Sequence, residues 1–204
     1  MDQKRHQLQG DRAATKQLLD EYIDYLMAHS DSEHPAWNLE MIRSGKRNKW
    51  NYIDGCMITG ILELYEITGE ARFLDFADRF LSGFVEEDGH IRTYDPEEYT
   101  LDNVNPAKNL FPLYDLTGKE KYRKAIELVR SQLSTMPRTP EGNFWHKLIY
   151  PNQVWLDGIY MALPFYMEYE KRFDQEKDCP DICQQIANVE IRMRDPETGL
   201  YYHG

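Results

Sequence analysis

A repeat of about fifty residues constrains the fold of this chain more than any other feature of its sequence. The stretches LYEITGEARF, from Leu64, and LYDLTGKEKY, from Leu113, are nearly identical, and the Thr-Gly pair in each is typical of the end of a helix. After each turn, apolar side chains recur with the spacing of one helix face. They are Phe73, Ala77, Phe80 and Phe84 in one unit and Tyr122, Ile126, Val129 and Leu133 in the next. Each unit therefore predicts two helices joined by a tight turn.

Three aspartates stand at the same position of the repeat, each at the predicted start of the first helix of a unit. They are Asp54 in YIDG, Asp102 in LDN and Asp157 in WLDG. A further amphipathic helix precedes the first unit and runs from about Leu18 to Met27. We therefore expect seven helices and little or no strand. Helix pairs of this kind cannot bury their apolar faces alone and need neighbouring units.

Such pairs can stack as an open solenoid or close into an α/α toroid. The long loops between the pairs carry aromatic residues and histidine instead of the plain polar residues of a connector, which favours the toroid. Closing a ring of six units takes roughly 320 residues, and the chain has 204. We expect one all-α domain over residues 1–204 that covers about the first half of an (α/α)6 toroid and is truncated at its C-terminal end. The exposed repeat end would allow self-association.

Charge and composition argue against several classes of protein. The net charge of −11 and the lack of a stretch dense in Lys and Arg argue against a nucleic-acid partner. The sequence has no run of about eighteen apolar residues and no signal-peptide core, so we expect neither membrane insertion nor secretion. The cysteines Cys56, Cys179 and Cys183 form neither a disulfide framework nor a complete zinc motif. We expect a cytoplasmic protein with reduced thiols and no bound metal.

Asp157 has two interpretations. It can cap the helix that follows, because aspartate accepts hydrogen bonds from the free N–H groups of a first turn. It can also keep its proton beside Trp155 and act as an acid. If Asp102 and Asp157 face one another across a pocket, they cannot both ionise comfortably, and one pKa is raised. Asp157 follows an indole whereas Asp102 lies among asparagines, so we expect Asp157 to be the more desolvated proton donor and Asp102 its charged partner.

The stretch FWHKLIYPNQVWLD adds His146, Lys147, Tyr150 and Trp155 to the same end of the repeat. Aromatic faces beside a few hydrogen-bonding groups are what a sugar ring needs. His146 and Lys147 are alternatively a solvated loop tip. For Trp50 and Tyr52, in KWNYIDG, the alternative is packing at the rim.

The segments WNYIDG, LDNVNPAKNLFPLYDLTG, RTPEGNFWHKLIYPNQVWLDGIYMALPF and RDPETGLYYHG resemble the unsaturated rhamnogalacturonyl hydrolases of glycoside hydrolase family 105. The unsaturated glucuronyl hydrolases are a more distant likeness. The resemblance runs from about Trp50 to Gly204 and implies an (α/α)6 toroid.

The resemblance also implies a reaction and its residues. Family members remove a 4,5-unsaturated uronic acid from the non-reducing end of oligosaccharides left by a pectin lyase. Asp157 matches the catalytic acid, which protonates C4, and Asp102 matches the aspartate beside it. Tyr52, His146, Lys147, Trp155 and His203 match positions that contact the substrate. No metal or other cofactor is implied.

Two other functions stay open on the sequence. Another toroid enzyme, such as a sugar epimerase, would need paired histidine bases, and the repeat offers aspartates instead. A non-catalytic helical-repeat module would bind carbohydrate or a protein partner. Asp54 has no matched catalytic role, so we expect it to act through a cap or local hydrogen bonds.

Overall fold

The computed structural model describes residues 2–204, with side chains from Ala13 onward, and the chain forms two compact units, up to Asn48 and from Lys49 to Gly204. The first unit contains α1 (Asp2–Ala28) and α2 (Leu39–Ser44). The predicted helix around Leu18 to Met27 lies within α1. The short α2 was not predicted; Asn38 caps it by accepting a hydrogen bond from the Met41 backbone N–H at 3.2 Å. The single domain over residues 1–204 stays a prediction.

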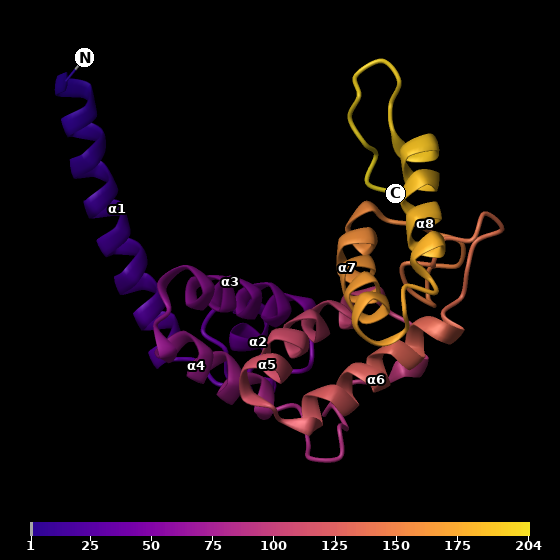
Figure 1. Ribbon diagram of the computed structural model, residues 1–204, viewed down its shortest axis with the longest axis horizontal. Coiled ribbons are helices and arrows are strands. Elements are labelled where there is room, and N and C mark those ends of the chain that lie inside the picture. Colours follow the sequence, from indigo (N-terminus) through magenta and orange to yellow (C-terminus); the bar gives the residue numbers. More distant parts are fainter. Residues whose placement is uncertain (1) are drawn as a thin grey trace. The chain divides into compact units, whose positions relative to one another are not determined.

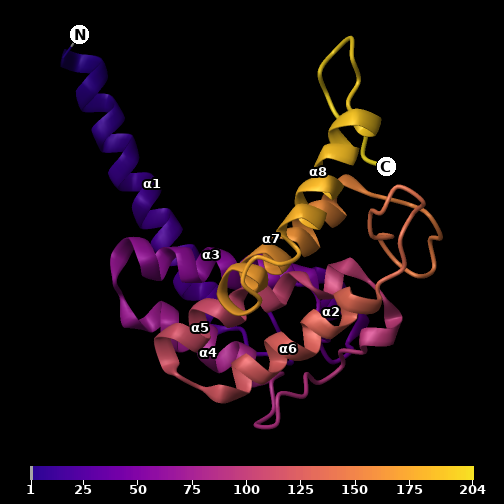
Figure 2. The ribbon, with the colours of Figure 1, turned by 45° about the vertical axis from the view of Figure 1, so that its right-hand side comes forward.

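The second unit contains the three predicted helix pairs (Figure 1). These are α3 (Tyr52–Thr68) with α4 (Ala71–Ser82), α5 (Leu110–Thr117) with α6 (Glu120–Thr135), and α7 (Leu156–Phe173) with α8 (Cys179–Met193). The helices of each pair pack against one another, as Figure 2 also shows. Between the helices the described residues form isolated β-bridges and no strand. The prediction of an all-α chain is confirmed.

The two near-identical turns end their helices in the same way. Gly69 and Gly118 adopt left-handed backbone conformations, with φ of 71° and 65°. Each donates its backbone N–H to the carbonyl of Tyr65 or Tyr114, and both bonds measure 2.8 Å. An L-residue pays a steric cost at such φ values, so glycine is the natural end of both helices.

The middle pair departs from the predicted repeat. Asp102 lies in a 3-10 turn, η2 (Leu101–Asn103), and a second turn, η3 (Asn105–Asn109), follows before α5 begins. A third such turn, η1 (Pro96–Glu98), precedes them. The expectation that Asp102 opens its helix is therefore wrong. The residue before a proline disfavours helical backbone, and Pro106 follows Asn105 here.

The η3 turn packs against both α3 and α7 and so joins the helix pairs. Its buried amides bond to the first turn of α3, Asn105 Nδ2 donating to the Tyr52 carbonyl at 3.1 Å and Asn109 Nδ2 to the Gly55 carbonyl at 2.9 Å. A Cβ at Gly55 would lie 2.6 Å from Asn105 Nδ2 and 2.8 Å from the Pro106 Cα. Glycine at this position of YIDG therefore lets η3 approach α3.

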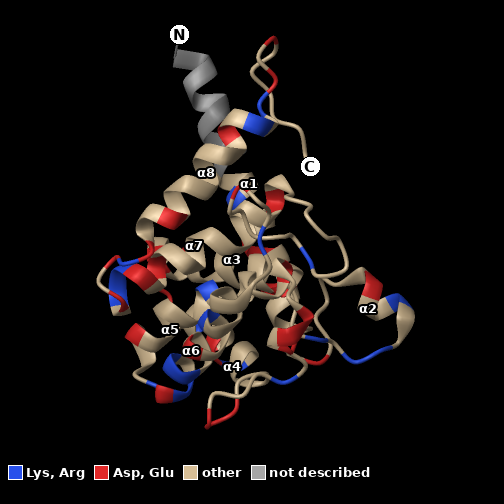
Figure 3. Ribbon diagram, turned by 90° about the vertical axis from the view of Figure 1, so that its right-hand side faces the viewer, with Lys and Arg blue, Asp and Glu red and all other residues tan. Residues whose placement is uncertain are grey.

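Helices α6 and α8 both carry charged residues of both signs (Figure 3). Most of their ion pairs are exposed and contribute little, but one group is buried. Arg130 Nη2 of α6 lies 3.2 Å from Glu170 Oε1 of α7 and 2.8 Å from Asp178 Oδ2 at the start of α8. The Glu170 side chain is 0% exposed. This network fixes the third helix pair on the second.

No helix among the described residues is both long enough and apolar enough to span a bilayer.

Candidate functional site

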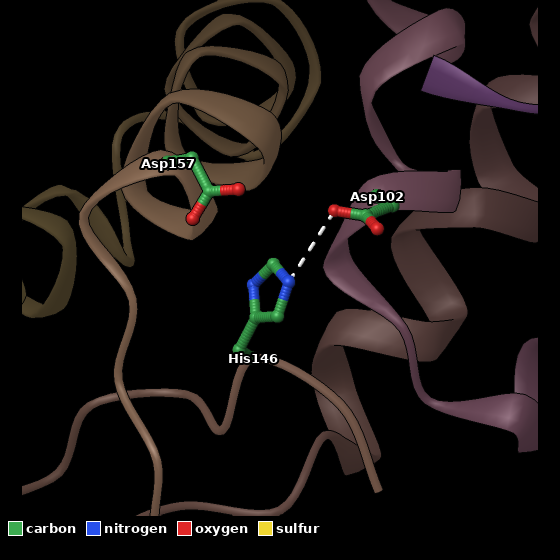
Figure 4. Close-up of side chains that lie close together, drawn as sticks. All are labelled: Asp102, His146 and Asp157. Atoms are coloured by element: carbon green, nitrogen blue, oxygen red, sulfur yellow. Dashed lines mark ion pairs between the residues drawn. The ribbon is translucent and has the colours of Figure 1, made fainter. Parts of the chain in front are cut away.

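Asp102, His146 and Asp157 come from three separate elements and meet at one place (Figure 4). Asp102 belongs to η2, Asp157 to the first turn of α7, and His146 to the loop between α6 and α7. One carboxylate oxygen of each aspartate and one ring nitrogen of His146 lie within 4.8 Å of one another. The structure thus brings together the two aspartates that the repeat pattern singled out.

Backbone pairing places the loop beside Asp102. The Leu101 N–H donates to the His146 carbonyl at 3.0 Å, and the His146 N–H donates to the Gln153 carbonyl at 2.8 Å. Thr100 and Lys147 form an antiparallel bridge. These bonds hold His146 and Lys147 against the segment that carries Asp102.

Gly158 allows the loop to reach α7. A Cβ at this position would lie 2.8 Å from His146 Nδ1 and 3.3 Å from Leu101 Cδ1. The glycine of WLDG therefore has the same role as Gly55 in YIDG, because each lets a neighbouring segment contact the start of an inner helix.

Asp102 is the better paired of the two aspartates. Its Oδ2 lies 2.6 Å from Lys147 Nζ, its Oδ1 lies 3.5 Å from His146 Nε2, and its side chain is 14% exposed. The role of Asp102 as the charged partner stays a prediction.

Asp157 is the more exposed aspartate, so the expected order of desolvation is wrong. Its side chain is 40% exposed, its Oδ1 accepts the Gly158 backbone N–H at 3.0 Å, and His203 Nε2 lies 3.5 Å away. The indole of Trp155 stacks instead on His146, with ring centroids 4.3 Å apart, and on Tyr150, at 5.1 Å. Asp157 is not the N-cap either, since α7 begins at Leu156 and Trp155 holds the cap position without a side-chain bond.

His146 is buried, with 1% of its side chain exposed. Burial lowers its pKa from the ordinary value of 6.5, because desolvation disfavours the imidazolium. The charges of Asp102 and Asp157 oppose this shift, and those of Lys147 and His203 add to it. The interpretation of this histidine as a solvated loop tip is therefore wrong.

A cavity of about 520 Å³ adjoins Asp102. Three of its lining residues were predicted, namely Tyr52, Asp102 and Lys147. The others are Asn51, Glu98, Thr100, Asn103, Leu148 and Ile149. His146 and Asp157 lie outside this lining, and Trp155 contributes to a different cavity, also of about 520 Å³, beside α8. Asp102, His146 and Asp157 thus form one polar cluster with a pocket on the Asp102 side.

Asn51 is the pocket residue that sequence reasoning could have found. It is the N-cap of α3, where its Oδ1 accepts the Asp54 backbone N–H at 3.0 Å and its Nδ2 donates to Asp54 Oδ2 at 2.9 Å. An asparagine three residues ahead of an acid, just before an apolar run, is a capping signal. Asp54 itself is buried and acts through these local hydrogen bonds, as expected.

Trp50 follows the packing interpretation. It is buried, and its Nε1 donates to the Asn103 carbonyl at 2.7 Å. Tyr52 remains partly exposed at the pocket.

The carboxylate oxygens of Asp102 and Asp157 and the ring nitrogen of His146 are atoms of the kind that coordinates a metal ion. Lys147 Nζ, at 2.6 Å from Asp102, already supplies positive charge to that carboxylate.

Residues 18–204 match Glycosyl Hydrolase Family 88. The chain belongs to this family. Together with the relatives named next, the match confirms the resemblance stated from the sequence.

Individual relatives agree with the family. An unsaturated rhamnogalacturonyl hydrolase of Bacillus subtilis (strain 168), YesR, is 26% identical over 160 residues, which are 76% of this chain and 44% of the relative. A solved glycoside hydrolase from family 105 of C. acetobutylicum ATCC 824 is 42% identical with a TM-score of 0.75, covering 88% of this chain and 48% of that one. These family structures are α/α toroids, so the predicted fold class is confirmed.

A more distant structure shows the fold alone. It is a possible member of family 105 from Klebsiella pneumoniae subsp. pneumoniae MGH 78578, with 24% identity and a TM-score of 0.62 over 76% of this chain and 40% of that one. The chain spans about half the length of the relatives it matches.

Proposed function

We propose that this chain carries the aspartate pair of an unsaturated rhamnogalacturonyl hydrolase, which removes 4,5-unsaturated galacturonic acid from lyase-generated pectin oligosaccharides. The observation that carries the proposal is the meeting of Asp102 and Asp157 within 4.8 Å, with Lys147 paired to only one of them. Asp102 is thereby ion-paired, whereas no lysine or arginine among the described residues pairs with Asp157.

In the proposed reaction Asp157 is the general acid and then the base. It transfers its proton to C4 of the vinyl ether, and positive charge develops at C5 as an oxocarbenium ion. The Asp157 carboxylate then takes a proton from water, and the water oxygen bonds to C5. The resulting hemiketal opens and releases the remaining sugar, so atoms and charge balance. A general acid positioned on carbon contributes typically about a hundredfold or more.

Asp102 stabilises the charge that develops during this reaction. Its carboxylate is paired with Lys147, and a carboxylate near C5 favours an oxocarbenium ion electrostatically. The partly exposed Tyr52 ring beside it offers an apolar face for a sugar. Lys147, which lines the pocket, and His203, which lies beside Asp157, are the groups proposed to bind the uronate carboxylate.

The exposure of Asp157 sets an expectation for the chain by itself. At 40% exposure the Asp157 carboxyl is open to water, whereas closed active sites expel water from the reacting groups. We therefore expect the 204-residue chain alone to turn over substrate negligibly. Further protein that covered Asp157 would exclude this water.

The test joins this chain to the part of the C. acetobutylicum relative that it does not cover, after that relative has itself been shown to act on the substrate. We expect the folded chimera to hydrolyse unsaturated rhamnogalacturonan disaccharide and Asp157→Asn to abolish turnover. Preference for an unsaturated glucuronyl disaccharide would contradict the proposed specificity. Full activity of the Asp157→Asn chimera would contradict the proposed acid.

A further inference from the structure

His146 is held more rigidly than a residue that contacts substrate needs to be. Both of its backbone groups are bonded, one to the neighbour of Asp102 and one to Gln153 ahead of α7. Its ring stacks on Trp155 with planes 16° apart. Its Nδ1 faces Gly158, where even a methyl group would lie 2.8 Å away. The imidazole is thus fixed between the two aspartates and shielded from the pocket.

The position of the ring decides which nitrogen carries the proton. Burial favours the neutral imidazole, which has one N–H. Nε2 faces the Asp102 carboxylate at 3.5 Å, and a carboxylate only accepts, so the N–H belongs on Nε2. Nδ1 is then an acceptor, and no donor among the described residues reaches it. Figure 4 shows this second nitrogen on the side of Asp157.

We propose that His146 is a positioning residue that holds the proton on Asp157. Its Nε2–H donates to Asp102, and its Nδ1 accepts a hydrogen bond from the protonated carboxyl of Asp157. The exposed Asp157 carboxyl reaches Nδ1 by rotation of its side chain or through one bridging water. A buried acceptor without a donor is costly, so this hydrogen bond stabilises the acid form of Asp157. The catalytic meaning of this contact rests on the proposed function, whereas the contact itself does not.

Other groups act on the same proton. The N-terminus of α7 and the Gly158 N–H favour the Asp157 anion, as does His203 when protonated. The Asp102 anion opposes them, although Lys147 reduces its effect. His146 is the one of these groups that offers a neutral acceptor to Asp157, so removing its Nδ1 should lower the pKa of Asp157.

The test is an NMR titration of the 204-residue chain, which needs no turnover. Carboxyl ¹³C shifts report the protonation of Asp157, with Asp157→Asn identifying its resonance, and imidazole ¹⁵N shifts report the tautomer of His146. Two variants separate the ring nitrogens. His146→Gln places an amide N–H near Nε2 but leaves no acceptor at Nδ1. His146→Asn leaves an amide oxygen near Nδ1.

We expect a neutral His146 with its proton on Nε2 at neutral pH. His146→Gln should lower the proton affinity of Asp157 by about tenfold, or one pKa unit, and His146→Asn by clearly less. An imidazolium at neutral pH, or equal shifts of Asp157 in both variants, would overturn the proposal. The ¹⁵N measurement on the unchanged chain decides the first point even if a variant does not fold.

Kinetics of the chimera give an independent readout. His146→Gln should lower kcat roughly a hundredfold, as misplacement of a catalytic group does, with little change in KM. It should also move the alkaline limb of the kcat profile to lower pH, because Asp157 loses its proton earlier. A raised KM with an unmoved pH profile would instead identify His146 as a substrate contact. If the chimera is inactive, the NMR result still stands and the failure belongs to the proposed function.

Discussion

Replacing glycine by alanine at three helical positions tests how the site is assembled. Gly158→Ala would place a methyl group 2.8 Å from His146 Nδ1 and 3.3 Å from Leu101 Cδ1. Gly55→Ala would place one 2.8 Å from the Pro106 Cα, which is backbone and cannot move alone. Gly60→Ala is the matched control, since nothing lies within 4 Å of its Cβ.

The magnitudes follow from two opposing effects. Alanine in place of a helical glycine gains at most about 1 kcal/mol, whereas overpacking costs about 1–3 kcal/mol. His146 cannot yield easily, because it is buried, stacked on Trp155 and bonded through both backbone groups. We therefore expect Gly60→Ala to stabilise the chain by about 0.5–1 kcal/mol. Gly158→Ala should destabilise it by about 1 kcal/mol and Gly55→Ala by about 2 kcal/mol.

Urea unfolding followed by circular dichroism measures these changes in the free energy of unfolding. A Gly158→Ala variant as stable as Gly60→Ala would show that the loop is not held against α7, and the described cluster would lose its basis. A strongly destabilised Gly60→Ala variant would show that the space around each glycine Cβ position does not determine the effect of alanine there.

Three further predictions use the same unfolding measurement. Arg130→Ala should lower the free energy of unfolding by about 3–5 kcal/mol, because Glu170 is left buried and unpaired. Glu170→Gln should lower it by only about 1 kcal/mol, and equal decreases in the two variants would argue against a buried ion pair. Asp54→Asn should lower the free energy of unfolding by about 0.5–2 kcal/mol, because it weakens the hydrogen bonds to Asn51. Turnover by the chimera should be unchanged, and loss of turnover without loss of stability would make Asp54 catalytic. Because the pKa of His146 is lowered in the folded chain, the unfolded chain binds this proton first as the pH falls below about 6.5. The free energy of unfolding should therefore decrease as the pH falls below that value, and His146→Gln should remove up to about 1.4 kcal/mol per pH unit from this pH dependence. An unchanged pH dependence in the variant would contradict a buried neutral histidine.

The helix pairs were predictable because their signals are local. Turns ending in Gly69 and Gly118 require left-handed backbone, and the apolar stripes behind them have a helical period. The placement of Asp102 in a 3-10 turn was not predictable from the repeat. It depends on the buried amide bonds of Asn105 and Asn109 to α3, which are contacts between distant residues.

The meeting of the two aspartates was predictable from the sequence, whereas their relative exposure was not. The repeat spacing pointed to Asp102 and Asp157, and the structure brings them together. Their relative exposure depends on where the Trp155 ring lies, and that ring follows His146 instead of its sequence neighbour Asp157. Adjacency in sequence was therefore a poor guide to desolvation.

The central claim is that Asp157 delivers its proton to carbon and not to the glycosidic oxygen. The direct measurement follows, in one reaction of the chimera with unsaturated rhamnogalacturonan disaccharide, the ultraviolet absorbance of the 4,5 double bond and the release of rhamnose. Protonation at C4 predicts that the absorbance falls in step with rhamnose release, and that Asp157→Asn stops both. Release of rhamnose with the absorbance retained would mean ordinary glycosidic cleavage and would contradict the account.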